Sequence, residues 1–278
     1  MTAPPRINWT FHSVLTDAVA DLQKHGFDDP TRLQSWLGKL RIAAIAWLPP
    51  EEAAMSQIQL ALNVAFKRAT SKSAILRHHP GISRFTIDRI EPAFRANLQR
   101  RILASADLIK LNRAQAVEKT LQRFSGWASS IPEGGSRIVD RLDVKEHIGK
   151  PLQQARFEQR RLEIDQGHKL MASISATIAG QTNAIAMVWR SNWRQAGYDY
   201  RPDHKERDQK VYAIRGSWAL SEGLMKSGAD GYLDQITQPA EEPFCRCFGR
   251  YLTALRDLPE DMLTEKGRKA LAKSIFRK

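Results

Sequence analysis

Apolar side chains recur at helical spacing through most of the first half of the chain, and proline or glycine interrupts them at few points. One such run covers residues 14–22, and another follows Asp29-Pro30-Thr31 and continues to residue 45. Pro49-Pro50-Glu51-Glu52 ends that helix and opens another, because proline and acidic side chains are favoured in a first helical turn. The periodicity predicts a helical N-terminal half.

Two breaks divide the helical pattern further. His78-His79-Pro80-Gly81 is the first, and residues 85–127 then read as helix, with Pro92 as the one obvious interruption. Residues 129–136 (Ser-Ser-Ile-Pro-Glu-Gly-Gly-Ser) form the strongest loop sequence in the chain. We expect a domain boundary there.

Beyond this loop the pattern changes from purely helical to mixed. Residues 156–194 predict one or two long helices broken near Gly180, with Trp189 and Trp193 on one helical face. Residues 211–214 and 244–252 are rich in β-branched and aromatic side chains and predict strands, with a short helix at 217–226 between them. The predicted fold class is mainly α with a small β element near the C-terminus, an α+β architecture.

This organisation predicts three regions. Residues 1–135 form a helical N-terminal region that is basic from about residue 67, and residues 136–255 form an α+β module. Residues 256–278 form a basic C-terminal tail helix.

Positive charge is concentrated in the middle of the chain. The formal net charge is +13, and residues 67–161 hold 20 Lys and Arg against 9 Asp and Glu. Such a surplus attracts nucleic acid, acidic proteins or anionic surfaces. We expect a contact surface for a polyanion that includes Arg95, Arg100 and Arg101; solvated helix faces without a partner are the alternative.

Both cysteines of the chain lie two residues apart, at Cys245 and Cys247. In a strand they would point to the same face, about 7 Å apart at the backbone, because side chains alternate with period two. Two thiolates on one face can share a zinc ion, which takes four ligands, and His204 is the predicted third. The fourth is expected among three side chains: Asp203, Asp208 and His168. The alternative is that both cysteines pack as small apolar groups beside Phe244 and Phe248.

Other sequence features argue against a membrane protein or an enzyme. The N-terminus lacks the apolar run of a secretory signal, and no stretch reaches the roughly 18 apolar residues of a spanning helix. Phosphate-binding glycine loops, nucleophile elbows and His-Glu-x-x-His motifs are missing from the sequence. Four acids of residues 199–208 alternate with basic residues, a pattern typical of a salt-bridged turn. We therefore expect a protein that acts by binding.

The order of several motifs resembles a known family. A Trp-Arg-x-x-Trp-Arg segment at residues 189–194 precedes Asp199-Tyr200-Arg201-Pro202-Asp203-His204, and Pro243-Phe244-Cys245-Arg246-Cys247 leads into a predicted strand. Residues 156–252 resemble the Mu F-like head morphogenesis module of tailed bacteriophages. The family signature falls on five residues: Arg201, His204, Cys245, Arg246 and Cys247. Two positions depart from the family pattern, since Pro243-Phe244 replaces a His-Pro pair and Gln209 replaces a glycine.

The resemblance implies a minor head protein that binds the portal protein and the major capsid protein during head assembly, with double-stranded DNA as a further partner. Its expected location is the virion, in the head interior or at the portal, and the host cytoplasm during assembly. Arg201 and Arg246 are the implied binding residues of the module, and zinc is the candidate cofactor. A stand-alone nucleic-acid-binding protein is the main alternative, and a nuclease or transferase-type enzyme centred on His204 is a third.

Overall fold

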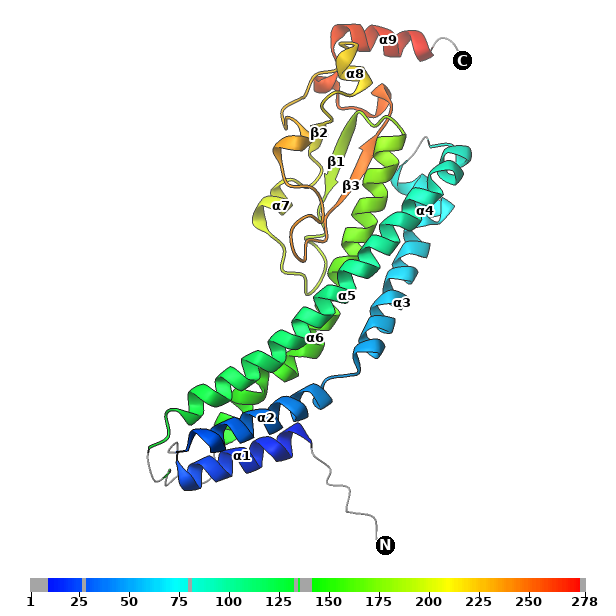
Figure 1. Cartoon of the computed structure of the whole chain (residues 1–278). Coiled ribbons are helices and arrows are strands. Elements are labelled where there is room, and N and C mark those ends of the chain that lie inside the picture. The colour runs from blue at the N-terminus through cyan, green and yellow to red at the C-terminus, as the bar shows by residue number, and fades with distance from the viewer. Residues whose placement is uncertain (1–9, 27–28, 80–81, 133–134, 136–141, 276–278) are drawn as a thin grey trace. The chain divides into compact units, whose positions relative to one another are not determined.

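The computed structural model describes residues 10–26, 29–79, 82–132, 135 and 142–275 of the 278-residue chain. Figure 1 shows the helices and strands in chain order. The helices are α1 (Phe11–His25), α2 (Pro30–Trp47), α3 (Glu51–Thr70), α4 (Lys72–His78), α5 (Arg84–Ala128), α6 (Leu142–Gln181), α7 (Pro202–Glu206), α8 (Trp218–Ser221) and α9 (Glu265–Ile275). The strands are β1 (Ala186–Arg190), β2 (Val211–Ala213) and β3 (Phe248–Leu252). Three 3₁₀ turns lie at Leu233–Gln235, Leu255–Asp257 and Glu260–Met262.

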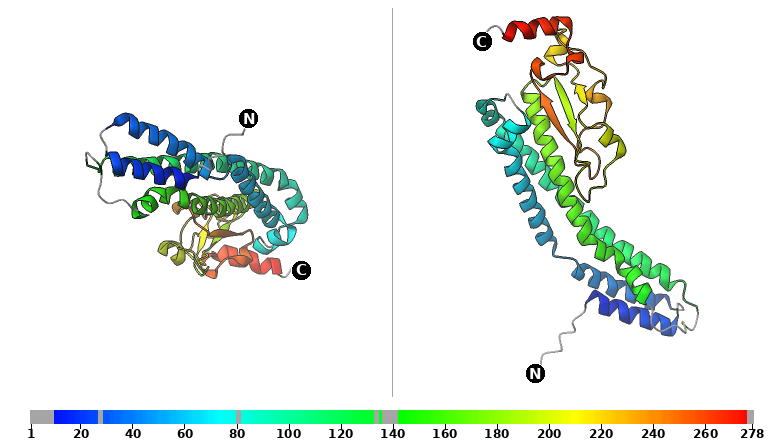
Figure 2. Two further views of the ribbon diagram at one scale, coloured as in Figure 1. Left: turned by 90° about the horizontal axis from the view of Figure 1, so that it is seen from below. Right: turned by 180° about the vertical axis from the view of Figure 1, so that it is seen from behind.

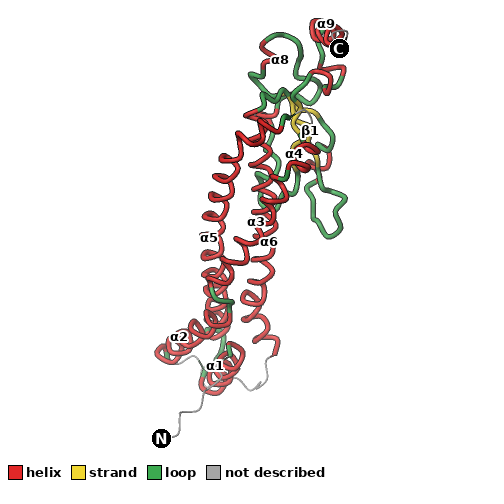
Figure 3. Tube along the Cα trace, turned by 90° about the vertical axis from the view of Figure 1, so that its right-hand side faces the viewer, coloured by secondary structure: helices red, strands yellow, loops and turns green. Residues whose placement is uncertain are grey.

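The predicted fold class is confirmed: helices dominate, and the sheet lies in the C-terminal part of the chain (Figure 3). Helix limits in the first half follow the capping signals. The Asp29 carboxylate accepts a hydrogen bond from the backbone N–H of Thr31 at 2.8 Å, which caps α2. Gly26 ends α1 with a φ of 77°, a conformation that glycine adopts without steric cost. None of the described helices is long and apolar enough to cross a membrane.

Two compact units form, and each is built from two separate stretches of the chain. Unit 1 comprises Met1–Gln57 and Ser105–Arg161, and unit 2 comprises Ile58–Ala104 and Leu162–Lys278. Helices α3, α5 and α6 each contribute residues to both units. The units therefore do not divide at the loop of residues 129–136, because the helix ends on both sides of that loop belong to unit 1. The predicted boundaries of the three regions, at residues 135 and 255, stay a prediction.

The core of unit 1 is made by four helices. Apolar side chains of α1 and α2 pack against the C-terminal part of α5 and the N-terminal part of α6. Phe124 and Ile148 are fully buried there, one from each long helix. Arg41 of α2 forms an ion pair with Glu118 of α5 at the edge of this core. The periodic apolar positions of α1 are thus buried in one helical bundle, whereas Ile42 and Ile45 of α2 stay exposed.

Unit 2 contains a three-stranded antiparallel sheet in the order β2-β1-β3. Ala186 of β1 lies opposite Ala213 on one side and Leu252 on the other. The last turns of α6 run beside this sheet (Figures 1 and 2), and Ala179 of α6 packs with Met187 and Tyr251 of the strands. A second apolar cluster gathers the other sheet residues with 3₁₀ turns and the start of α8. The two clusters leave the central strand β1 buried along most of its length.

Several predicted limits in this region are wrong. Helix α6 ends at Gln181, close to the predicted break, but residues 186–190 form strand β1 where helix was predicted. Trp189 is therefore a buried strand residue and Trp193 lies in a turn, so they share no helical face. The residues of β1 read as helix because sequence periodicity over five positions does not separate a buried strand from a buried helix. The strand predicted from residue 244 starts at Phe248, and the helix predicted at 217–226 is the single turn α8.

The unit 1 core predicts different responses to two alanine substitutions in α6. Ile148→Ala removes a fully buried side chain and is expected to lower the free energy of unfolding by about 2–5 kcal/mol. Leu142→Ala changes a side chain that is 63% exposed on the same helix, and is expected to cost about 0.5 kcal/mol or less. Urea unfolding followed by circular dichroism measures both, and equal losses for the two variants would contradict this account of the core.

Candidate metal centre

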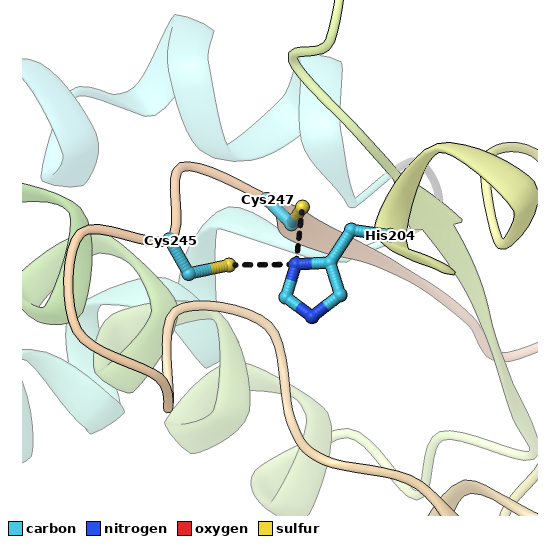
Figure 4. Close-up of side chains that lie close together, drawn as sticks. All are labelled: His204, Cys245 and Cys247. Carbon is cyan, nitrogen blue, oxygen red and sulfur yellow. Dashed lines mark hydrogen bonds between the residues drawn. The ribbon is translucent and has the colours of Figure 1, made fainter. Parts of the chain in front are cut away.

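His204, Cys245 and Cys247 converge in unit 2, as Figure 4 shows. The Nδ1 atom of His204 lies 3.5 Å from the sulfur of Cys245 and 3.6 Å from the sulfur of Cys247. All three potential ligand atoms lie within 4.8 Å of one another. The three side chains are at most 1% exposed. The predicted juxtaposition of the imidazole with both sulfurs is therefore present in the structure.

A proline-initiated helix positions the imidazole. Pro202 occupies the first turn of α7, and Arg201 before it is extended, as a residue preceding proline prefers. The turn that follows α7 is tied to β1: the backbone N–H of Gln209 donates to the carbonyl of Trp189, whose own N–H donates to the carbonyl of Lys210. His204 is thereby held against the buried ring of Trp189 in the central strand, with ring centroids 5.2 Å apart.

The cysteines lie in a tight loop before β3, and the prediction that they sit in a strand is wrong. Phe244 has a φ of +61°, and the N–H of Cys245 donates to the carbonyl of Glu242 at 3.1 Å. A left-handed backbone at a bulky residue is uncommon and carries strain of about 1–3 kcal/mol. The turn brings both sulfurs to the same nitrogen atom, which an extended strand would hold farther apart.

Three polar side chains hold this loop, and sequence reasoning identified none of them. The Asp165 carboxylate in α6 accepts the N–H of Phe244 at 2.6 Å. Around Arg246, the Tyr198 hydroxyl accepts the backbone N–H at 3.0 Å and the Asn192 amide donates to the carbonyl at 2.8 Å. Asp165 is 5% exposed and lies between apolar positions of α6. The sequence carries no local signal for this role, because the bonding partner of Asp165 lies 79 residues away.

Carboxylates face the second nitrogen of His204. Nε2 lies 3.5 Å from an oxygen of Glu242 and 3.8 Å from an oxygen of Asp203. This nitrogen is buried without a hydrogen-bond partner within the described residues. A proton on Nε2, directed at these carboxylates, leaves the lone pair of Nδ1 pointing at the sulfurs. Metal-binding histidines commonly have this arrangement, because the carboxylate fixes the tautomer and raises the basicity of the ligand.

The two thiols are coupled. The interaction with the Cys247 thiol lowers the pKa of Cys245 to about 6, while the same interaction and burial raise the pKa of Cys247. The opposite directions of the two shifts favour a state in which one sulfur is a thiolate and the other keeps its proton. A metal ion that binds both sulfurs must displace the remaining proton.

The donor set fits zinc. A tetrahedral site with Zn–S bonds of about 2.3 Å and Zn–N bonds of about 2.0–2.1 Å separates sulfur from nitrogen by about 3.6 Å. The two observed separations are 3.5 and 3.6 Å. Soft thiolates with one imidazole are also typical zinc ligands. His204, Cys245 and Cys247 are thus the residues that would hold the ion.

The predicted fourth ligands do not join the group. Asp203 faces Nε2 of His204, away from the sulfurs, and forms an ion pair with Arg207 at 2.8 Å. Asp208 accepts hydrogen bonds from the backbone of Ser191 and the indole of Trp193. His168 lies in α6 outside the group, and burial lowers its pKa. Among the described residues, the histidine and the two cysteines form the whole set of clustered ligands.

The arginines predicted to bind partners fall into two places. Arg201 pairs with Glu242 at 2.6 Å and donates to the carbonyl of Pro243, while Arg246 covers the ring of Tyr198 at 4.7 Å. Both therefore support the loop that carries the cysteines. The other three lie on α5 in unit 2. Arg95 pairs with Glu91, Arg100 donates to Asn97, and Arg101 donates to Ser173 of α6.

Comparison with protein-family models, with curated proteins and with solved structures finds no match for this chain. The interpretation of the site consequently depends on the residues of this chain alone. The Mu F-like resemblance stays a prediction.

The site predicts one zinc ion per chain in protein purified without chelators, measured by inductively coupled plasma mass spectrometry. His204→Asn and Cys245→Ser are expected to reduce the zinc content to background, because each removes one of three protein ligands. His168→Asn is the control and is expected to retain zinc, since His168 lies outside the group. Equal zinc loss in all three variants, or a wild-type protein that binds none, would reject the site.

Proposed function

We propose that this chain is a minor head protein of a tailed bacteriophage, with a Mu F-like module that acts in head morphogenesis. Its partners are the portal protein and the major capsid protein, and its place is the head interior or the portal region of the virion. The observation that carries the proposal is the convergence of His204, Cys245 and Cys247. His204 lies 41 positions before Cys245 and 43 positions before Cys247 in the sequence, yet the three side chains meet in one buried group.

A structural zinc ion suits such a module. A three-stranded sheet offers a small core, and the ion would join the α7 segment to the loop before β3 across about 40 residues of chain. Metal binding to a site that exists only in the folded state adds directly to folding stability. The supporting bonds from Asp165 and Tyr198 act on the same loop. We infer that the site maintains the shape of a binding module.

Burial of the site argues against the enzyme alternative. Three protein ligands with an open fourth position are typical of catalytic zinc, which substrate must reach. Here the histidine and both cysteines are at most 1% exposed, so the ligand atoms offer no approach to a polymeric substrate. Two acids of residues 199–208 are also committed to structural contacts, Asp203 with Arg207 and Asp208 with Ser191 and Trp193. A nuclease or transferase-type function therefore has little support.

The charge distribution supports DNA as a further partner. Residues 67–161 carry the basic surplus, and Arg95 and Arg100 are exposed on α5. Contacts between Lys or Arg and phosphates give affinity without sequence preference, which suits a protein close to packaged DNA. The same observation favours the second candidate function, a stand-alone nucleic-acid-binding protein.

The head assignment predicts that the chain copurifies with phage particles. Mass spectrometry of density-purified particles is expected to find it in the wild type, and particles from a Cys245→Ser/Cys247→Ser strain are expected to lack it. Arg256→Gln, at an exposed position outside the metal group, serves as the matched control and is expected to remain. If wild-type particles lack the chain, the head assignment fails whatever the zinc content.

The DNA role predicts a steep salt dependence. Retention of a duplex on a filter is expected at 50 mM salt and should fall by at least about tenfold at 200 mM salt, because binding releases counterions. A duplex of unrelated sequence is expected to bind equally well. Retention that is absent at low salt, or unchanged at high salt, would contradict a phosphate-contact role.

A further inference from the structure

A loop of unit 2 carries three aromatic side chains that remain accessible. The loop covers residues 191–201, between β1 and α7, and we call it the aromatic loop. Its rings belong to Trp193, Tyr198 and Tyr200, each partly exposed, and residues 194–197 are exposed. Loops held on a folded scaffold often carry binding residues, so these rings mark a candidate surface.

The aromatic loop is held in shape by its own hydrogen bonds. The N–H of Gln195 donates to the carbonyl of Asn192 at 2.9 Å, and the N–H of Tyr198 donates to the carbonyl of Gln195 at 3.2 Å. The indole N–H of Trp193 donates to the carboxylate of Asp208 at 3.2 Å. The rings are therefore ordered before any partner arrives, which lowers the entropy cost of binding.

Cations lie over the two rings nearest to each other. The guanidinium of Arg194 is 4.6 Å from the centroid of the Trp193 ring. The ammonium of Lys205 is 4.7 Å from the same centroid and 5.7 Å from that of Tyr200. The centroids of the Trp193 and Tyr200 rings are 6.3 Å apart. The two rings thus lie side by side and share one cation.

The cations of the aromatic loop have no counter-ion within the described part of the chain. Arg194, Lys205 and Arg246, which covers the third ring, form no ion pair there. Two exposed acids, Asp199 and Glu206, lie close in the sequence, but neither pairs with these cations. The surface therefore combines accessible rings with positive charge that a partner can neutralise.

Two other cations of unit 2 that lie over rings show the contrast. Arg215 covers the ring of Tyr232 at 3.9 Å and also pairs with Asp234 at 2.8 Å. Arg207 lies over a buried ring and pairs with Asp203 at 2.8 Å. A cation over a ring is therefore balanced at these two places and left unbalanced at the aromatic loop.

We propose that the aromatic loop binds single-stranded nucleic acid, with bases stacked on Trp193 and Tyr200 and phosphates held by Arg194, Lys205 and Arg246. A cation–π contact at an exposed site is weaker than the stacking of a base on an aromatic ring. A base can therefore replace the ammonium of Lys205 on the rings and leave it free to pair with a phosphate. A single strand fits because its unpaired bases offer their faces to the rings.

The inference goes beyond the proposed function, because these residues lie outside the basic segment of residues 67–161 and require no head partner. Phosphates and base faces are common to DNA and RNA, so the same surface fits either strand.

Fluorescence anisotropy of a labelled oligothymidine strand of about 12 nucleotides tests the stacking with full-length protein. An abasic strand of equal length is expected to bind at least about fivefold more weakly, because it keeps the phosphates and lacks the bases. Trp193→Leu is expected to weaken oligothymidine by about tenfold and to leave the abasic strand unchanged. Trp218→Leu, at an exposed tryptophan outside the loop, is the control and is expected to bind like the wild type.

The salt dependence tests the phosphate contacts. Each contact with a single strand contributes about 0.7 to the slope of log affinity against log salt, so Arg194→Gln/Lys205→Gln is expected to reduce that slope by about 1.4. Both side chains are exposed, so the circular dichroism spectrum is expected to stay unchanged. Arg215→Gln removes a cation that already has a counter-ion, and is expected to keep the wild-type slope.

Several results would overturn the proposal. The abasic strand, or polyglutamate, might compete as well as oligothymidine, and the loop would then be a general polyanion or acidic-protein surface. Unchanged binding in both loop variants, or equal weakening in the two controls, also overturns it. If Trp193→Leu alters the circular dichroism spectrum, the double variant with its exposed side chains decides.

An oligouridine strand of the same length separates the two sources of the ligand. Tighter binding of oligouridine supports the proposal with RNA as the ligand, and equal or tighter binding of oligothymidine supports it with DNA. Loss of the chain from phage particles, or of duplex retention on a filter, would leave these results unchanged. This test and those of the proposed function therefore fail independently.

Discussion

The contact between one imidazole nitrogen and two sulfurs is the constraint on which the C-terminal part of unit 2 depends. Burying an imidazole and two thiols in an apolar cluster is unfavourable unless their polar atoms find partners. Here Nδ1 of His204 faces Cys245 and Cys247, and Nε2 faces the carboxylates of Glu242 and Asp203. The carboxylate of Glu242 in turn pairs with Arg201. His204 and the two cysteines would therefore contact the ion directly, and the side chains of Glu242, Asp203 and Arg201 surround the far side of His204.

Helix α6 connects this group to the rest of unit 2. Its Asp165 receives the N–H of Phe244 and the ammonium of Lys169, so a single buried carboxylate serves both the cysteine loop and the helix. About two to three turns further along, Ser173 and Thr177 bind side chains of α5. The same helix thus supports the metal group and joins it to α5. Asp165 and Gln166 are buried polar residues on this helix, with Leu170 and Ile174 buried beyond them.

Short-range signals in the sequence correctly predicted the features that depend on residues close together in the chain. The cap at Asp29, the helix start after Pro50 and the fold class follow from short-range preferences, and the structure has them. The grouping of His204 with the cysteines was also predicted, from the ligand chemistry of zinc and from the resemblance of motif order. Strand β1 was missed because five buried residues carry no distinctive period. The roles of Asp165 and Asn192 were missed because each bond joins residues more than 50 positions apart.

Both thiols of the chain lie in unit 2, since Cys245 and Cys247 are its two cysteines. Since the two thiols are buried, a modifying reagent reaches them only when this unit opens, and the labelling rate measures how often that happens. The helical bundle of unit 1 can stay closed or unfold without contributing to that signal. The rate of thiol labelling therefore measures the opening of unit 2 alone, whereas the circular dichroism signal reports on both units.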